Sequence, residues 1–167
     1  GIVRDLIKER INAVRAEWSI IKDNIFVYDS VDVNMDDLNN YCEENEVDVI
    51  IIDQLDKINI RGSYNAQHEK LKEIYKQARE LAKRNNVLVI GISQAGAEAH
   101  NQQRIDFNWL DNSKTGKAGE ADLIIGIGKP RDSDKDYDRW LYLSKNKLTG
   151  EHIDIECSLN HTLSRYE

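Results

Sequence analysis

The chain has 167 residues, of which 40% are hydrophobic and 32% charged, as in a protein with one folded core. No apolar run approaches the roughly 20 residues that cross a bilayer, and no signal-peptide pattern opens the chain. The two distant cysteines favour a reducing, cytoplasmic setting over a disulfide scaffold or a zinc site. The net charge of −7 excludes a protein that coats nucleic acid through bulk positive charge, but not a ring whose loops supply a local positive field.

The N-terminal part of the chain predicts two helices with a strand between them. Residues 2–18 place apolar side chains at helical spacing along one stripe. Residues 24–30 contain the apolar run IFVY, which predicts a short buried strand. Asn34 then has the position of a helix cap, because its side chain can accept from the first backbone N–H groups and Asp37 lies three residues on.

Three aliphatic runs predict strands inside a parallel sheet. They cover residues 47–53, 87–93 and 122–128, and their composition is that of strands buried on both faces. Between the first two runs, residues 66–85 show the clearest helical pattern, with charged side chains on the outer face. The predicted inner face of that helix holds Leu71, Ile74, Tyr75, Ala78, Leu81 and Ala82.

The pattern changes after Pro130, the single proline. Residues 131–138 predict an exposed hairpin loop. Polar and apolar positions are mixed in residues 139–144 and 152–158, as in an antiparallel pair of strands with one solvent-exposed face. Together these elements predict an α/β three-layer sandwich, with a mainly parallel sheet, right-handed crossovers and an antiparallel hairpin at the C-terminal edge. No linker or repeat divides the chain, so residues 1–167 are expected to form a single domain.

Two polar side chains stand where a ligand of such a sheet would bind, beyond the carboxyl ends of the strands. Asp53 closes the first aliphatic run, where a carboxylate can hold Mg²⁺ through water. Gln94 follows the next run, where an amide can sense a γ-phosphate by hydrogen bonding. The alternative for Asp53 is an aspartate that only caps the following turn.

The order of these motifs resembles the part of DnaB-type replicative helicases that follows their phosphate-binding loop. Asp53 matches the Walker B aspartate, and Ser93-Gln94 matches the family's Ser-Gln pair. Further matches are Ala121-Asp122 opening a strand, Lys145-Asn146-Lys147 with Thr149-Gly150, and the closing stretch from Leu163 to Glu167. The resemblance covers residues 24–167, and residues 113–117 look more like phage helicases than bacterial ones.

The resemblance implies a partial RecA-like ATPase domain in a homo-hexameric motor that couples ATP hydrolysis, with Mg²⁺, to movement along single-stranded DNA. Asp53 would hold Mg²⁺ through water, Gln94 would report the γ-phosphate, and Lys145 and Lys147 would reach the nucleotide of the neighbouring subunit. The loop that matches the channel loop would grip DNA phosphates through Asn112, Ser113, Lys114, Thr115, Gly116 and Lys117.

The sequence departs from the family pattern in ways that leave alternatives open. It contains no GxxxxGK[ST] motif, so the phosphate-loop strand is missing and the isolated chain should not hydrolyse ATP. Lys147 stands where the family has arginine, which keeps the charge but loses the planar fork that grips phosphate. The rival interpretations are a RecA- or KaiC-like ATPase of recombination or regulation, and a non-catalytic degenerate scaffold. For the lysine pair and the 112–117 loop, the alternative is ordinary solvated surface.

Overall fold

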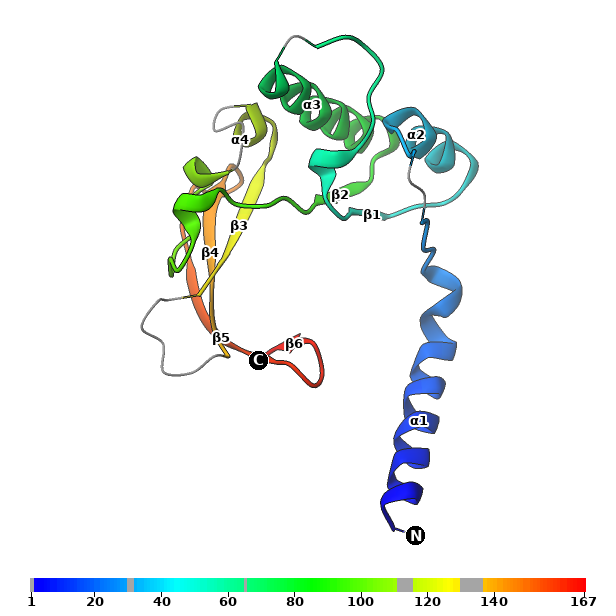
Figure 1. The fold of residues 1–167 in the computed structure, drawn as a ribbon. Coiled ribbons are helices and arrows are strands. Elements are labelled where there is room, and N and C mark those ends of the chain that lie inside the picture. The colour runs from blue at the N-terminus through cyan, green and yellow to red at the C-terminus, as the bar shows by residue number, and fades with distance from the viewer. Residues whose placement is uncertain (1, 30–31, 65, 111–115, 130–136) are drawn as a thin grey trace. The chain divides into compact units, whose positions relative to one another are not determined.

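The computed structural model describes residues 2–29, 32–64, 66–110, 116–129 and 137–167 (Figure 1). The chain divides into two compact units, Gly1–Val31 and Asp32–Glu167, which we describe separately. Across these described ranges, no helix has both the length and the apolar composition needed to cross a membrane.

The first unit consists of helix α1 (Ile2–Ile21), a short 3-10 turn, Lys22–Asn24, and an extended tail. The helix confirms the apolar stripe predicted for residues 2–18. The strand predicted for residues 24–30 is wrong over its described part, because residues 25–29 adopt no strand and Phe26 and Val27 are 70% and 88% exposed. A strand satisfies its backbone by pairing, and none of the described strands pairs with this stretch.

The second unit begins with helix α2 (Met35–Glu44), whose start confirms the predicted cap. The Asn34 side chain accepts hydrogen bonds from the backbone N–H groups of Asp36 and Asp37, at 2.9 and 3.2 Å. The Asp37 carboxylate accepts in return from the backbone N–H of Asn34 at 3.1 Å, which completes a capping box.

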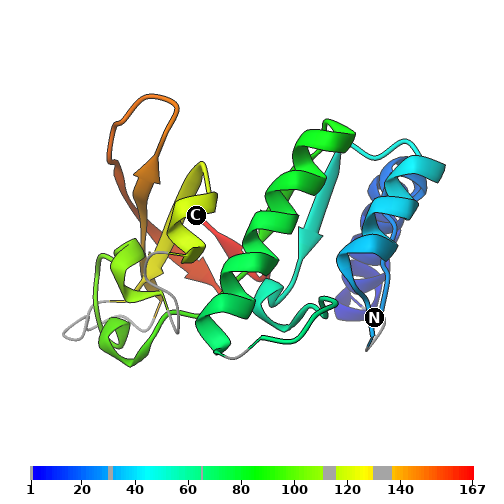
Figure 2. The same cartoon turned by 90° about the horizontal axis from the view of Figure 1, so that it is seen from above.

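Strands β1 (Val49–Ile52) and β2 (Leu88–Gly91) pair in parallel, with Ile52 opposite Gly91, and helix α3 (Gln67–Asn85) connects them. Figure 2 shows α3 lying alongside the pair with α2 beside it. The predicted helix over residues 66–85 is thus confirmed. The core between the helices and one face of the pair contains Met35, Ile52, Leu55, Ile58, Leu71, Ile74 and Ala78.

The opposite face of this two-stranded sheet is exposed, unlike the sequence expectation of burial on both faces. Ile51 on β1 and Leu88 on β2 are 66% and 57% exposed. The covered face is packed so closely that a Cβ on Gly91 would lie 2.5 Å from the Leu55 side chain, which follows in the 3-10 turn η2 (Leu55–Lys57). Glycine therefore lets the turn after β1 close over the end of β2.

The rest of the unit is an antiparallel sheet of four strands, in the order β3-β4-β5-β6. Its members are β3 (Leu123–Gly128), β4 (Asp138–Asn146), β5 (Asp154–Asn160) and β6 (Arg165–Tyr166). The β4–β5 pair confirms the predicted hairpin. The molecule is α/β with a parallel and an antiparallel sheet, but β3 pairs with β4 rather than extending the parallel sheet as expected.

Residues 95–110 are anchored on the antiparallel sheet. They contain the 3-10 turns η3 (Ala97–Ala99) and η4 (Phe107–Trp109). Arg104 forms an ion pair with Asp154, with Nε 2.9 Å from Oδ1, and its guanidinium lies 5.7 Å from the centre of the Tyr142 ring. The backbone N–H of Phe107 donates to the buried hydroxyl of Ser144 at 2.6 Å. Helix α4 (Gly116–Glu120) follows and leads into β3.

Candidate nucleotide and DNA site

The structure places Asp53 and Gln94 at the same edge of the parallel strands. Beyond the last paired residues, the backbone N–H of Ile92 donates to the carbonyl of Ile52, and that of Leu55 donates to the carbonyl of Ile92, both at 2.9 Å. Gln54, directly after Asp53, adopts a left-handed conformation with φ of 56°, which turns the chain at the strand end. Both Asp53 and Gln94 are exposed, so their side chains are open to a ligand.

The surroundings of Asp53 fit a carboxylate that holds a hydrated cation. Within the described ranges, its carboxylate has no hydrogen bond or ion pair, and no group of three or more potential ligand side chains forms a protein-only metal cage. Mg²⁺ usually keeps several waters and takes one or two carboxylates together with substrate phosphates. A single exposed aspartate at this edge matches that coordination, whereas a structural metal site would need more protein ligands.

A partly buried polar cluster adjoins this edge, because Asp56 and Ser93 lie close in sequence to Asp53 and Gln94. The Lys117 side chain is 1% exposed, and its Nζ lies 2.6 Å from Oδ2 of Asp56 and 3.2 Å from the Ser93 hydroxyl. The Ser93 hydroxyl donates to the same Asp56 oxygen at 2.8 Å. The Tyr75 hydroxyl donates to Oδ1 of Asp56 at 2.8 Å, so both carboxylate oxygens are engaged.

Tyr75 serves this cluster as a neutral donor. Burial raises the pKa of Tyr75 well above its ordinary value, with a further rise from the negative charge of Asp56 and a lowering influence from its contact with Ser93. Its ring centre lies 5.7 Å from Nζ of Lys117, within the range of a cation–π interaction. Tyr75 therefore stabilises both members of the buried ion pair.

The lysine pair at the end of β4 holds the C-terminal end of helix α4. Lys145 donates to the carbonyl of Ala118, and Lys147 donates to the carbonyl of Gly119 at 3.0 Å. The two ammonium groups thus meet consecutive carbonyls, as expected for positions two apart that share a face. Lys147 also lies 3.4 Å from Asp122. Burial lowers the pKa of Lys145, and the positive charge of Lys147 lowers it further.

Arg79 ties helix α3 to the last residue of α4 and to Asp122, which follows it. Its guanidinium lies 3.7 Å from Glu120 and 3.2 Å from Asp122. The Nε of Arg79 is buried without a hydrogen-bond partner among the described residues. Helix α4 is therefore held by Arg79 from α3 and by the lysine pair from β4, in addition to the buried Lys117.

The residues predicted to bind DNA divide into two groups. Asn112, Ser113, Lys114 and Thr115 lie outside the described residues. Gly116 and Lys117 lie in α4 and are buried, so the exposed loop lysine expected at position 117 is not observed. Its ammonium is engaged by Asp56, which leaves it unavailable to a DNA phosphate in this conformation.

Sequence reasoning missed Asp56 and Tyr75, although one signal pointed to close packing. Lys117 is flanked by the small residues Gly116, Ala118 and Gly119, which suit a backbone packed against its neighbours. The partner Asp56 is 61 residues away in the sequence, so no local spacing indicates the pair.

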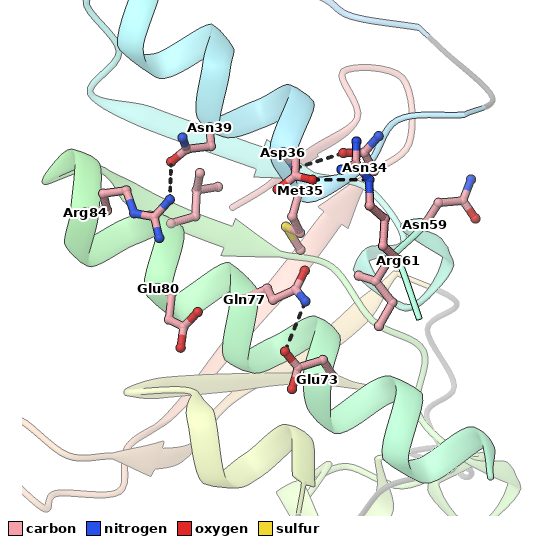
Figure 3. Close-up of a pocket in the computed structure, with 12 residues that line it drawn as sticks. Asn34, Met35, Asp36, Asn39, Asn59, Arg61, Glu73, Gln77, Glu80 and Arg84 are labelled. Atoms are coloured by element: carbon pink, nitrogen blue, oxygen red, sulfur yellow. Dashed lines mark hydrogen bonds and ion pairs between the residues drawn. The ribbon is translucent and has the colours of Figure 1, made fainter. Parts of the chain in front are cut away.

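A separate cleft of about 320 Å³ lies between α2, α3 and the 59–61 segment (Figure 3). Its polar side chains largely bind one another: Arg61 lies 3.5 Å from Asp36, and Gln77 donates to Glu73 at 3.0 Å. None of the predicted site residues lines it. The candidate nucleotide site is thus the open edge at Asp53 and Gln94, not this cleft.

The sequence matches the DnaB-like helicase C-terminal domain family over residues 4–167. No curated protein matches the sequence. Among solved structures, that of an ATPase domain matches 95% of this chain and 64% of its own length, with 15% identity and a TM-score of 0.76.

A second solved structure, that of a DnaB-like replicative helicase and its interactions with primase, matches 86% of this chain with 15% identity and a TM-score of 0.74. This chain spans 36% of that protein's length and 64% of the solved ATPase domain's. These likenesses show the RecA-like helicase ATPase fold. Because the family match spans nearly the whole sequence, the chain belongs to the DnaB-like helicase C-terminal domain family.

Proposed function

We propose that this chain carries the hydrolysis and translocation part of an ATP-dependent replicative DNA helicase that works as a homo-hexameric ring. The observation that supports this proposal most is that Asp53 and Gln94, both exposed, lie at the carboxyl edge of β1 and β2 in a chain of the DnaB-like family. Ligands of parallel α/β sheets bind at this edge.

In the proposed reaction Asp53 would hold Mg²⁺ through water, and the bound ion would supply positive charge to the ATP phosphates. Gln94 donates its amide N–H to the γ-phosphate and so distinguishes ATP from ADP. Lys145 and Lys147 belong to the neighbouring subunit's nucleotide site. Lys147 is the better placed of the two to leave its present contacts, because 36% of its side chain is exposed.

For the DNA contact we propose residues 112–115, with Lys114 as the positive group and Gly116 as the small residue at the start of α4. Lys117 is not included among the proposed DNA contacts, because its side chain is buried. The GxxxxGK[ST] loop, absent from this sequence, would come from another part of the proposed larger protein, the parent helicase.

The test is ATP hydrolysis by the parent helicase carrying Asp53→Asn. We expect turnover to fall on the order of 100-fold or more, because the variant loses the charge that holds the ion. Asp48→Asn is the matched control, since Asp48 is also exposed but precedes the opposite end of β1. Equal turnover of the two variants would contradict the proposed site, and the absence of ATP turnover in the unmodified parent helicase would favour a non-catalytic scaffold.

A further inference from the structure

Positive charge is crowded around the C-terminal end of helix α4. Three cations meet there: Arg79 from α3, Lys145 at the end of β4, and Lys147 directly after that strand. The carboxylates of the same group are Glu120 and Asp122. Burial lowers the pKa of Lys145, and the positive charges of Lys147 and Arg79 lower it further. With all five groups ionised, the cations outnumber the carboxylates by one.

The Asp122 carboxylate is shared between two of these cations. Nη2 of Arg79 lies 3.2 Å from Oδ1 of Asp122, and Nζ of Lys147 lies 3.4 Å from the same oxygen. Two positive groups at one oxygen repel each other, so each weakens the hold of Asp122 on the other. Arg79 is the better anchored of the two, because its Nε is buried and its Nη1 lies 3.7 Å from Glu120, a second carboxylate.

Lys147 is the cation that can leave this group most easily. Its backbone is fixed, since its N–H donates to the carbonyl of Asp122 at 2.9 Å. Its ammonium is held only at a partly exposed place, by the carbonyl of Gly119 and by Asp122, whose side chain is 54% exposed. An ion pair as exposed as this one shifts an equilibrium by up to about 5-fold. The presence of Arg79 reduces even that hold.

We propose that Arg79 is a positioning residue that frees Lys147 for the nucleotide of the neighbouring subunit, by keeping Asp122 paired when the lysine leaves. The inference rests on the proposed function, in which Lys147 belongs to that nucleotide site. Without Arg79, Asp122 has Lys147 as its cation and holds it more firmly on α4. Turnover then falls with the fraction of Lys147 that is free, although Arg79 itself touches no nucleotide.

The test compares steady-state ATPase of parent-helicase variants. We expect Arg79→Gln to lower kcat about 3- to 5-fold, while KM for ATP stays within about 2-fold of the unmodified protein. Adding Asp122→Asn should restore kcat to within about 2-fold, because the carboxylate that retains Lys147 is gone. Arg79→Lys should keep more than about half of the turnover, because it leaves a cation near Asp122. A purely structural role of Arg79 predicts a double variant no better than Arg79→Gln, and this result would overturn the inference.

Salt dependence gives a second readout that loss of structure would not move. The deficit of Arg79→Gln should shrink between about 0.05 M and about 0.5 M salt, because exposed ion pairs are screened. A deficit that salt leaves unchanged would count against the inference. Arg84→Gln is the matched control, since Arg84 is an arginine of the same helix that lines the separate cleft. It should leave kcat and KM unchanged.

A single variant keeps the test decisive if Arg79→Gln fails to fold. Asp122→Asn alone releases Lys147, so we expect kcat at least equal to that of the unmodified parent helicase. A loss as large as that caused by Lys147→Met would overturn the inference, because Asp122 would then be needed to present the lysine and not to retain it.

The outcomes also separate this inference from the function on which it rests. If Lys147→Met keeps full turnover, the proposed role of Lys147 at the neighbouring nucleotide fails, and the role of Arg79 fails with it. If Lys147→Met lowers turnover while Arg79→Gln keeps it, the proposed function stands and only the role of Arg79 is refuted.

Discussion

The buried ion pair predicts a measurable loss of stability when Lys117 is replaced by methionine in the chain itself. Methionine keeps much of the length of the lysine side chain but removes its charge. Asp56 is then left with the hydroxyl donors of Ser93 and Tyr75 and no cation. The protein must either keep an unpaired carboxylate in a largely buried place or protonate it, and both cost free energy of folding.

The magnitude follows from the geometry. Two unit charges 2.6 Å apart attract by at most about 6 kcal/mol at an effective dielectric constant of about 20, and desolvation offsets part of this. Removing one partner of a buried pair costs about 3–5 kcal/mol. Because the Asp56 side chain is 22% exposed and keeps two hydroxyl donors, we expect the lower end, about 3 kcal/mol.

The assay is urea unfolding followed by tryptophan fluorescence in a Trp18→Phe background. The remaining tryptophans, Trp109 and Trp140, both lie in the Asp32–Glu167 unit that holds the pair. Lys76→Met, which removes only exposed ion pairs, should change the free energy of unfolding by less than about 0.5 kcal/mol. Adding Asp56→Asn to Lys117→Met should recover roughly 2 kcal/mol. A Lys117→Met variant as stable as the Lys76→Met control would refute the buried pair.

Three other predictions concern the core, the lysine pair and the isolated chain. Ile74→Ala, at a fully buried core position, should lower the free energy of unfolding by about 3 kcal/mol in the same urea assay, and a loss below about 1 kcal/mol would contradict the packing. Lys147→Met should raise the pKa of Lys145 in an NMR titration, because it removes a repelling positive charge, and an unchanged pKa would contradict the contact. Because folding lowers the pKa of Lys145, its ammonium form destabilises the fold at low pH, and this cost is lost as pH rises through the folded-state pKa. The isolated chain should show almost no ATP binding by calorimetry, and an Asp53-dependent Kd of about 1 mM or tighter would show that the phosphate-binding loop is dispensable.

Local patterns predicted the elements whose causes are local. The start of α2 follows from one asparagine and one aspartate three residues apart, and these form the capping box. Helix α3 follows from its apolar spacing, and Leu71, Ile74, Ala78 and Leu81 are buried as predicted. The β4–β5 pair follows from the mixed polar and apolar patterning of residues 139–144 and 152–158. In each case the residues that decide the structure are close together in the sequence.

Features that depend on distant partners could not be predicted in this way. The run at residues 25–28 has strand composition, but a strand also needs a neighbour, and its described part has none. The aliphatic run at residues 122–128 indicates a strand, but composition does not say whether its neighbour is β2 or β4. The burial of Lys117 is set by Asp56, far away in the chain, so a loop-like composition around it gave the opposite expectation.

The edge at Asp53 and Gln94 could be predicted because strand ends in a parallel sheet coincide in space. The aliphatic runs place both residues just beyond a strand, and the structure brings the two ends together. The roles of the two side chains in hydrolysis remain predictions, as do the contacts of Lys145 and Lys147 with a neighbouring subunit. In the structure these two lysines donate hydrogen bonds to backbone carbonyls of α4, a structural contact that the sequence pattern does not indicate.

The central claim, that the chain is part of a helicase motor, is tested most directly by strand separation on a forked DNA duplex. With ATP and Mg²⁺, we predict that the parent helicase unwinds the fork and that Asp53→Asn abolishes unwinding while Asp48→Asn does not. A protein that pairs complementary strands instead of separating them would be a recombinase-like ATPase. Strand pairing, or unwinding that persists without the Asp53 carboxylate, would contradict the account.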